Sequence, residues 1–344
     1  MSDDWNKFVD GLRDAGVRLD ASVAGQCDDV HDDGQRSLLR ALLNLLGRLE
    51  ADCDVPELVP FNGWREKFFM DNPQYRYWIT DIRDDCAYRI VGNVGASVYQ
   101  SITVYAGTGI QDATAVARID SDELKPDNAG HYDVALDLPP GSTSVWVRYV
   151  HRTIDPDEPG WCRIETISGA TQSTDYEPAS VGRQLARVGK FVSHLPQAFE
   201  LATAADRAQP NEVRHWSAMA GGAAFTEPGI HYLRGAWQLD AGEALVIEGQ
   251  LPACRHWNIV LYNQFLNSLD YRRRTVVRGA ANSTITDGGY RFVLAARDPG
   301  SADYDWLDTE GRGFGLFVLR FLLPDSTPEL PQVRRVRLDE WVCP

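Results

Sequence analysis

The chain has 344 residues, of which 44% are hydrophobic and 24% charged, and its formal net charge at pH 7 is −15. This length suits two domains of common size, and the composition is that of a globular protein and excludes a disordered chain. The negative charge argues against nucleic acid as a partner, because a phosphate backbone would be repelled. One short basic run, residues 272–274, is too small to change that expectation.

The six cysteines are scattered and form no C-x-x-C pair, which is typical of reduced thiols and indicates no zinc site. The N-terminal "MSDDWNKFVDGLRDAG" lacks a basic segment followed by an apolar one, and no run of about 18 apolar residues occurs. We therefore expect a cytoplasmic protein with no membrane span.

The first 60 residues are expected to be helical. Trp5, Phe8, Val9 and Leu12 recur at nearly helical spacing, and "SLLRALLNLLGRLEADC" places its leucines on one stripe. Between these two segments, "CDDVHDDGQ" is expected to form an aspartate-rich turn that ends in a cap of the second helix.

From about Tyr77 the apolar pattern changes to period two, with short strands separated by Gly, Pro, Asn and Asp. We expect a first β-sandwich domain over residues 61–170 and a helical connector over 171–225, in which Pro196 would kink or break the helix. A second β-sandwich domain is expected over residues 226–344.

The two strand-rich parts resemble each other. "AYRIVGNVGASVYQSITVY" (87–105) aligns with "ALVIEGQLPACRHWNIVLY" (244–262) at an offset of 157, and later matches follow in the same order at offsets of 158 and 172. Such a series predicts a mainly β protein with two duplicated antiparallel sandwich or jelly-roll-like domains, N-terminal helices and a helical connector. The aligned positions include Gly92 with Gly249, Tyr105 with Tyr262, Tyr132 with Tyr290, and Arg148 with Arg320.

Several motifs resemble an uncharacterised bacterial family known as domain of unknown function 1214. They are "DNPQYRYW" (71–78), "YRIVGNVG" (88–95), "HWNIVLYNQFLNSLDY" (256–271), "DPG" (298–300) and "WLDTEG" (306–311). The resemblance covers most of the chain from about residue 60. It implies two jelly-roll-like domains with helical additions and assembly into oligomers, and it implies no reaction.

Metal ligands are sparse in the sequence. It has neither an H-x-H pair followed by glutamate nor an H-E-x-x-H helix, which argues against a histidine-ligated metal. Two aspartate clusters are the weak candidates for a hard cation such as Mg²⁺, although solvated acidic turns are the favoured interpretation of both. Their members are Asp28, Asp29, Asp32 and Asp33 in the first cluster, and Asp81, Asp84 and Asp85 in the second.

The usual markers of nucleotide cofactors and covalent hydrolases are missing. The sequence contains no G-x-S-x-G elbow, no Walker loop, and no G-x-G-x-x-G that follows a strand. No redox cofactor is therefore expected.

The stretch "HWNIVLYNQFLNSLDYRRR" (256–274) holds the strongest site candidates. Asn263 falls on the same strand face as Trp257, so it would be a buried amide if the strand continues, or a turn cap if the strand ends at Tyr262. Asp270 and Tyr271 would supply an acid or base and a hydroxyl group, with Asn263 as the third catalytic candidate. A structural Asp–Arg pair is the favoured alternative.

The remaining candidates would bind substrate. Arg148 and Arg320 lie at equivalent positions and are expected to face inward, where a buried structural pair is the commoner role. The substrate-binding candidates are Tyr77, Trp257, Arg272, Trp306, Asp308 and Arg320.

Together these features favour a cytosolic enzyme acting on a largely apolar metabolite, such as an isoprenoid, steroid or polyketide, by cofactor-independent isomerisation, cyclisation or elimination. In one variant, residues 272–274 and Arg278 would hold a diphosphate through a Mg²⁺ ion bound by one of the two aspartate clusters. The alternative is a non-catalytic small-molecule carrier or an oligomeric scaffold. A homo-oligomer is compatible with either hypothesis.

Overall fold

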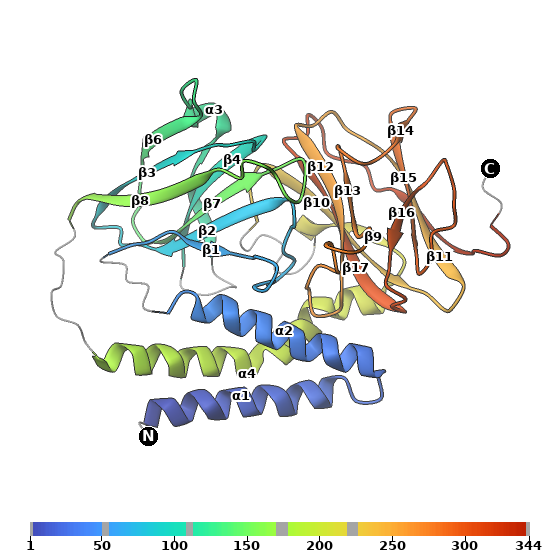
Figure 1. Cartoon of the computed structure of the whole chain (residues 1–344), viewed down its shortest axis with the longest axis horizontal. Coiled ribbons are helices and arrows are strands. Elements are labelled where there is room, and N and C mark those ends of the chain that lie inside the picture. The colour runs from blue at the N-terminus through green and yellow to red at the C-terminus, as the bar shows by residue number, and fades with distance from the viewer. Residues whose placement is uncertain (1–2, 50–54, 108–112, 170–177, 219–225, 342–344) are drawn as a thin grey trace. The chain divides into compact units, whose positions relative to one another are not determined.

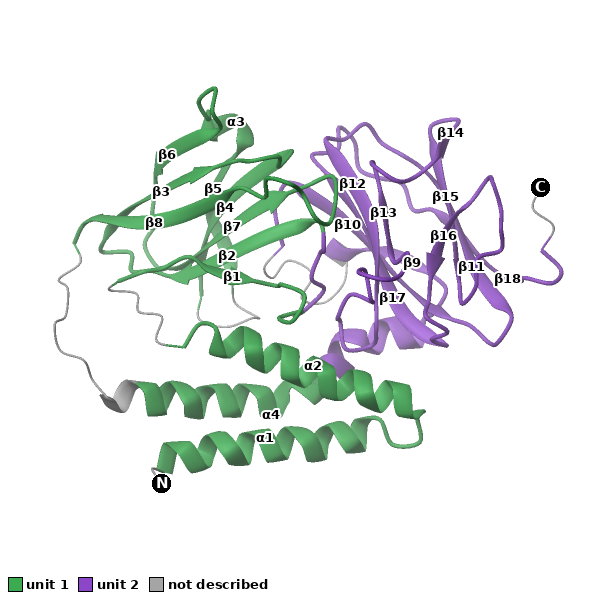
Figure 2. Ribbon diagram, viewed as in Figure 1, with its two compact units in different colours: residues 1–68, 74–198 green, residues 69–73, 199–344 purple. Residues whose placement is uncertain are grey.

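The computed structural model describes residues 3–49, 55–107, 113–169, 178–218 and 226–341, which form two compact units (Figure 2). Unit 1 comprises Met1–Phe68 and Gln74–Ala198, and unit 2 comprises Phe69–Pro73 and Phe199–Pro344. These units differ from the four segments expected from sequence. The N-terminal helices belong with the first sandwich, and a five-residue segment from the first half belongs to the second unit.

Among the described residues, the long helices are α1 (Asp3–Ser22), α2 (Asp28–Leu46) and α4 (Pro178–Ala208), with a short α3 (Ser121–Leu124) (Figure 1). Within unit 1, α1 and α4 touch through their backbones, because a Cβ atom added to Gly11 would lie 2.3 Å from the Gly189 carbonyl oxygen. Nowhere in the described ranges is a helix both long and apolar enough to cross a membrane.

One local expectation about these helices was wrong. Asp28 begins α2, so the aspartate-rich stretch forms the first turns of a helix rather than a turn between helices. Acidic side chains there are stabilised by the positive end of the helix dipole. Pro196 lies inside α4, which continues on both sides of it, so the proline does not break the helix and only the expected kink stays a prediction.

Unit 1 contains two sheets, with the strand orders β1-β2-β7-β4-β5 and β6-β3-β8. Their strands are β1 (Val59–Phe61), β2 (Tyr75–Asp81), β3 (Ala87–Asn93), β4 (Tyr99–Ala106), β5 (Thr114–Asp120), β6 (His131–Ala135), β7 (Ser142–Val150) and β8 (Trp161–Ser168).

Unit 2 contains sheets with the orders β13-β12-β17-β10-β9 and β14-β15-β11-β18. Their strands are β9 (Val213–His215), β10 (Ile230–Gln238), β11 (Glu243–Gln250), β12 (His256–Tyr262), β13 (Val277–Gly279), β14 (Ile285–Thr286), β15 (Gly289–Ala295), β17 (Phe314–Leu322) and β18 (Gln332–Arg337). β16 (Asp305–Asp308) pairs with β15 in parallel, whereas the other ladders are antiparallel.

The strand orders confirm the duplication. The first sheet of unit 1 places β2, β7 and β4 side by side, and unit 2 repeats that order with β10, β17 and β12. The smaller sheets correspond in the same way, since β6-β3-β8 is repeated as β15-β11-β18. The chain therefore consists of two copies of one mainly β architecture, with helical additions.

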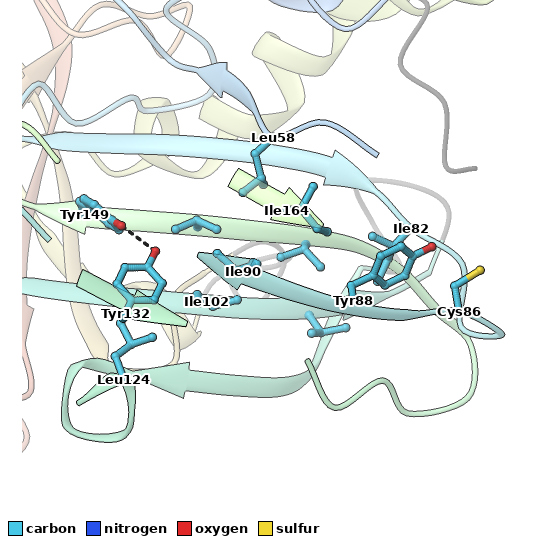
Figure 3. Close-up of a cluster of buried hydrophobic side chains, with 13 residues drawn as sticks. Leu58, Ile82, Cys86, Tyr88, Ile90, Ile102, Leu124, Tyr132, Tyr149 and Ile164 are labelled. Atoms are coloured by element: carbon cyan, nitrogen blue, oxygen red, sulfur yellow. Dashed lines mark hydrogen bonds between the residues drawn. The ribbon is translucent and has the colours of Figure 1, made fainter. Parts of the chain in front are cut away.

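Each copy has its own aromatic core. In unit 1 (Figure 3), the Tyr132 hydroxyl lies 2.6 Å from that of Tyr149, which donates to the Trp161 carbonyl oxygen at 3.0 Å. Tyr132 therefore donates to Tyr149, and burial raises the pKa of both hydroxyl groups. In unit 2 the Tyr290 ring stacks on Phe292 with their centroids 5.3 Å apart.

Candidate functional site

The predicted site begins where β12 ends, at Tyr262. Asn263 is buried, and its Oδ1 accepts backbone hydrogen bonds from Phe265 at 3.0 Å and Asn267 at 3.1 Å. The amide therefore fixes a tight loop after the strand, in agreement with the turn-cap alternative. Because the Asn263 Oδ1 already accepts two hydrogen bonds, it is not available to bind a substrate.

The segment Phe69–Pro73 packs against this loop within unit 2. The two carboxylate oxygens of Asp71 accept from the backbone and the hydroxyl group of Ser268, at 2.9 and 2.6 Å. The Tyr262 hydroxyl donates to the Asp71 carbonyl oxygen at 2.9 Å, and the Met70 N–H donates to Leu266. Since Asp71 is only 2% exposed, the two hydrogen bonds from Ser268 compensate for burying its charge.

The next residue of the segment is held by a reciprocal amide pair. Asn72 donates to Asn258 at 3.3 Å, and Asn258 donates back to Asn72 at 3.1 Å. Asn258 lies on β12 directly opposite Arg320 of β17. The segment and the strands are thus joined by buried polar contacts as well as by apolar packing.

Arg148 and Arg320 are both buried, but they point away from the sandwich cores. Their strand neighbours face those cores, since Tyr149 belongs to the core of unit 1 and Phe321 packs on Tyr290 in unit 2. Because alternate residues of a strand face opposite sides, both arginines lie on the other face of their sheets. The expected inward orientation was therefore wrong.

On that face, each arginine has partners within its own unit. Arg320 donates to the Met70 carbonyl oxygen at 3.0 Å and lies 5.7 Å from the Tyr262 ring centroid. Arg148 donates to the Tyr105 hydroxyl at 3.1 Å. These contacts indicate structural roles for both, with Arg320 helping to hold the Phe69–Pro73 segment.

Beyond the tight loop, residues 270–274 form a charged surface loop, which we call the arginine loop. The Asp270 N–H donates to Glu310 at 2.7 Å, and its Oδ1 accepts from the backbone N–H of Arg272 at 3.1 Å. Its Oδ2 lies 3.5 Å from the Arg273 guanidinium. Arg272, Arg273 and Arg274 are all exposed, while Tyr271 is half-buried.

The buried carboxylate of Asp308 supports the arginine loop. Its Oδ2 accepts from Arg274 at 2.9 Å, and its Oδ1 accepts from the backbone N–H of Glu310 at 2.7 Å. The hydrogen bond and the negative charge of Asp308 raise the pKa of the Arg274 guanidinium. Glu310 in turn accepts from Arg312 at 2.9 Å. The structure thus brings Asp270, Arg272 and Asp308 of the sequence candidates into one loop cluster.

Three other candidates are not members of this loop cluster. Trp257 is 4% exposed and packs in the sandwich core against Tyr290 and Phe292, so it does not line the mouth of a site. Trp306 is half-buried on β16 and donates to the Ala295 carbonyl oxygen at 3.0 Å. Tyr77 lies on β2 in unit 1.

The aspartates of the second weak metal cluster have protein partners. Asp81 pairs with Arg48 at 3.0 Å, and Asp85 pairs with Arg83 at 2.6 Å. Asp84 accepts from the backbone N–H of Gly141 at 2.6 Å. Within the part of the chain that the structure describes, no group of three or more His, Cys, Asp or Glu side chains is placed to hold a metal ion.

Sequence reasoning missed Asp71, Ser268 and Glu310. Asp71 and Ser268 are 197 residues apart, a separation at which no local pattern indicates contact. Asp71 lies in the motif at 71–78, and Ser268 lies in the motif at 256–271. The sequence therefore drew attention to both regions but did not indicate that they are in contact.

No protein-family model matches the chain, and no curated protein does either. Among solved structures, an uncharacterised protein from Burkholderia cenocepacia is similar over 98% of both chains, with a TM-score of 0.89 and 25% identity. This similarity supports the two-sandwich fold. Because the similar protein is uncharacterised, the similarity indicates no activity.

More remote structures are also similar. A protein from Vibrio parahaemolyticus has a TM-score of 0.48 and 13% identity over 93% of this chain and 100% of its own. Procruciferin, an 11S globulin from Brassica napus, has a TM-score of 0.23 and 7% identity over 83% of this chain and 81% of its own. At these values neither carries an argument about function.

Proposed function

We propose that this chain is a non-catalytic small-molecule carrier that binds the phosphate or diphosphate group of its ligand at the arginine loop. The observation behind this proposal is that three consecutive exposed arginines lie on a loop fixed by the buried Asp308 and by Glu310. Guanidinium groups bind phosphate oxygens in a fixed fork geometry. In a chain of net charge −15, such a cationic loop is a distinct place for an anion.

The contacts that hold the arginine loop in place should increase its affinity for an anion. Arg274 is already oriented by Asp308, and the backbone of the loop is tied to Glu310 through the Asp270 N–H. A loop that is held before the ligand arrives loses less conformational entropy on binding. The negative charge of Asp270 repels an anion. A Mg²⁺ ion that bridges Asp270 and a diphosphate would relieve that repulsion.

Calorimetric titration with inorganic diphosphate, with and without Mg²⁺, tests this proposal. Changing both Arg272 and Arg273 to Gln should weaken binding by at least about tenfold, because each charge-assisted contact contributes roughly 1.5–3 kcal/mol. Mg²⁺ should tighten binding to the unchanged protein, and added salt should weaken it.

The control removes the same charge elsewhere. Arg335 and Arg337 are exposed arginines of β18, with side chains 51% and 53% accessible. Changing both to Gln should leave diphosphate binding within about twofold, because these arginines are not part of the arginine loop and contribute only a weak, non-specific attraction. Equal losses in the two double variants would contradict the proposal, and so would titrations without heat in the unchanged protein.

A second candidate is the acid–base enzyme acting on a largely apolar metabolite. It is favoured by the Asp270 side chain, which is 25% exposed and next to the half-buried Tyr271. Changing Asp270 to Asn and Tyr271 to Phe separates the two functions. Turnover of a lipophilic substrate that disappears while ligand binding persists would support the enzyme, whereas a ligand that co-purifies unchanged supports the carrier.

A further inference from the structure

Two histidines meet at one edge of the larger sheet of unit 2. His215 ends the edge strand β9, opposite Leu233 of β10, and His231 lies two residues before Leu233. Both imidazoles therefore project from the same face of the two strands. The Nδ1 of His215 lies 2.9 Å from the Nε2 of His231, and the rings are nearly perpendicular, at 89°.

The chemistry of this pair is that of a metal-binding site. Burial and the neighbouring His215 lower the pKa of His231, which favours the neutral imidazole that binds metal ions. The facing nitrogen atoms share one hydrogen-bonded proton. A metal ion can bind to both nitrogen atoms once that proton moves to the other nitrogen atom of the ring that carries it.

The distance between the nitrogen atoms favours particular ions. Metal–imidazole bonds are about 2.0 Å long, so two adjacent positions of a square-planar ion place their nitrogen atoms about 2.8 Å apart. The observed 2.9 Å is close to that value. To bind one ion, each ring turns so that its lone pair points about 45° away from the line between the two nitrogen atoms. A tetrahedral ion such as Zn²⁺ requires about 3.3 Å.

The duplicated fold does not require this pair. In the first copy, the equivalent positions are Pro60 of β1 and Arg76 of β2, as the strand partners of Arg148 and Arg320 establish. The same strand pairing therefore forms without imidazoles. Both histidines are also partly exposed, which leaves a path for an ion.

We propose that His215 and His231 form a two-imidazole site for a square-planar transition-metal ion, Cu²⁺ or Ni²⁺, whose other positions are open to water or an external ligand. This site is independent of the arginine loop. Because late first-row ions follow the Irving–Williams order, Cu²⁺ binds more tightly than Ni²⁺.

The test uses the full chain and the metal salts alone. Cu²⁺ should bind in a one-to-one complex whose electron paramagnetic resonance spectrum shows two imidazole nitrogen atoms. Changing either His215 or His231 to Gln should weaken binding by at least about tenfold, as removing even an outer contact of a metal site does. Binding should also weaken below about pH 6, where imidazoles take up protons.

The matched control is His194→Gln on α4, an exposed histidine whose Nδ1 lies 2.7 Å from the Lys190 carbonyl oxygen. It should leave the affinity and the spectrum unchanged. Circular dichroism shows whether each variant is folded. The proposal is overturned if folded H215Q and H231Q bind Cu²⁺ as tightly as the unchanged protein, or if its spectrum shows a single imidazole nitrogen.

Discussion

At the scale of single residues, Asn263 fixes the loop after β12 with one amide oxygen. Changing Asn263 to Ala would leave the backbone N–H groups of Phe265 and Asn267 buried without an acceptor. The expected cost is about 2–6 kcal/mol, since each of the two unsatisfied buried groups costs about 1–3 kcal/mol. Urea unfolding followed by tryptophan fluorescence measures this loss.

A second asparagine provides the comparison. Asn282 also caps a loop, with its Oδ1 accepting from Gly279 at 2.8 Å, but its side chain is exposed. Water can replace that acceptor, so Asn282→Ala should cost less than about 1 kcal/mol. If Asn263→Ala and Asn282→Ala lose the same amount of stability, burial does not determine how much a loop-capping amide contributes.

His151 makes unit 1 sensitive to acid. It is fully buried, and its Nε2 lies 3.1 Å from the Pro159 carbonyl oxygen. Burial, with a smaller effect from the Arg76 charge, lowers its pKa from 6.5 to about 4. Between these values the unfolded chain binds a proton that the folded chain does not. Stability is therefore full above about pH 6.5 and falls as the pH drops towards 4.

The expected loss from His151 alone is up to about 3 kcal/mol. His151→Gln keeps a donor for Pro159 but cannot titrate, so its stability should fall less between about pH 7.5 and about pH 4.5 than that of the unchanged protein. His131→Gln, at an exposed position, serves as the control and should behave like the unchanged protein. Parallel pH profiles for all three proteins would contradict this account.

At the scale of elements, both copies contain a glycine beneath a tyrosine ring on the neighbouring strand. Gly92 pairs with Tyr132, and Gly249 pairs with Tyr290. A Cβ atom at these glycines would lie 2.6 and 2.4 Å from the respective hydroxyl oxygens. Glycine in a strand is costly by itself, and the overlying ring compensates by covering the exposed backbone.

Changing Gly249 to Ala should therefore destabilise unit 2 by about 1–3 kcal/mol, because the methyl group forces the Tyr290 ring out of the aromatic core. Gly16 of α1 is the contrasting position, with nothing within 4 Å of the added methyl group. Gly16→Ala should be neutral or stabilising by up to about 1 kcal/mol. Thermal unfolding of the two variants decides the matter, and a neutral Gly249→Ala would show that the ring can move freely.

These paired positions also explain how much of the fold was predictable from sequence. Gly92, Tyr132 and their counterparts aligned at nearly constant offsets because strand spacing and cross-strand pairs recur in each copy. Period-two patterns placed most strands for the same reason. The site was less predictable. Asn263 was compatible with two environments, and the choice between them depended on a strand ending at Tyr262, a boundary that periodicity does not define.

At the scale of the whole molecule, unit 2 is discontinuous in sequence. Phe69–Pro73 belongs to it, while the rest of the unit begins at Phe199. The segment contributes the buried Asp71 and Asn72, whose partners Ser268 and Asn258 are themselves fully or almost fully buried. No linear division of the sequence into domains would contain all of unit 2, because the contacts that define the unit cross the boundary between the copies.

The consequence is that residues 199–344 alone should fold poorly, since the partners of Asp71 and Asn72 would lose their buried hydrogen bonds. A synthetic peptide of residues 66–76 added to this fragment should raise its Tm by on the order of 5 °C, because a ligand that binds only the folded state stabilises it. The same peptide with Asp71→Ala and Asn72→Ala should have little effect, because it cannot bond to Ser268 or Asn258. The contrary result is a fragment that unfolds cooperatively at the Tm of the full chain and responds to neither peptide. That result would show that the Phe69–Pro73 segment does not stabilise unit 2.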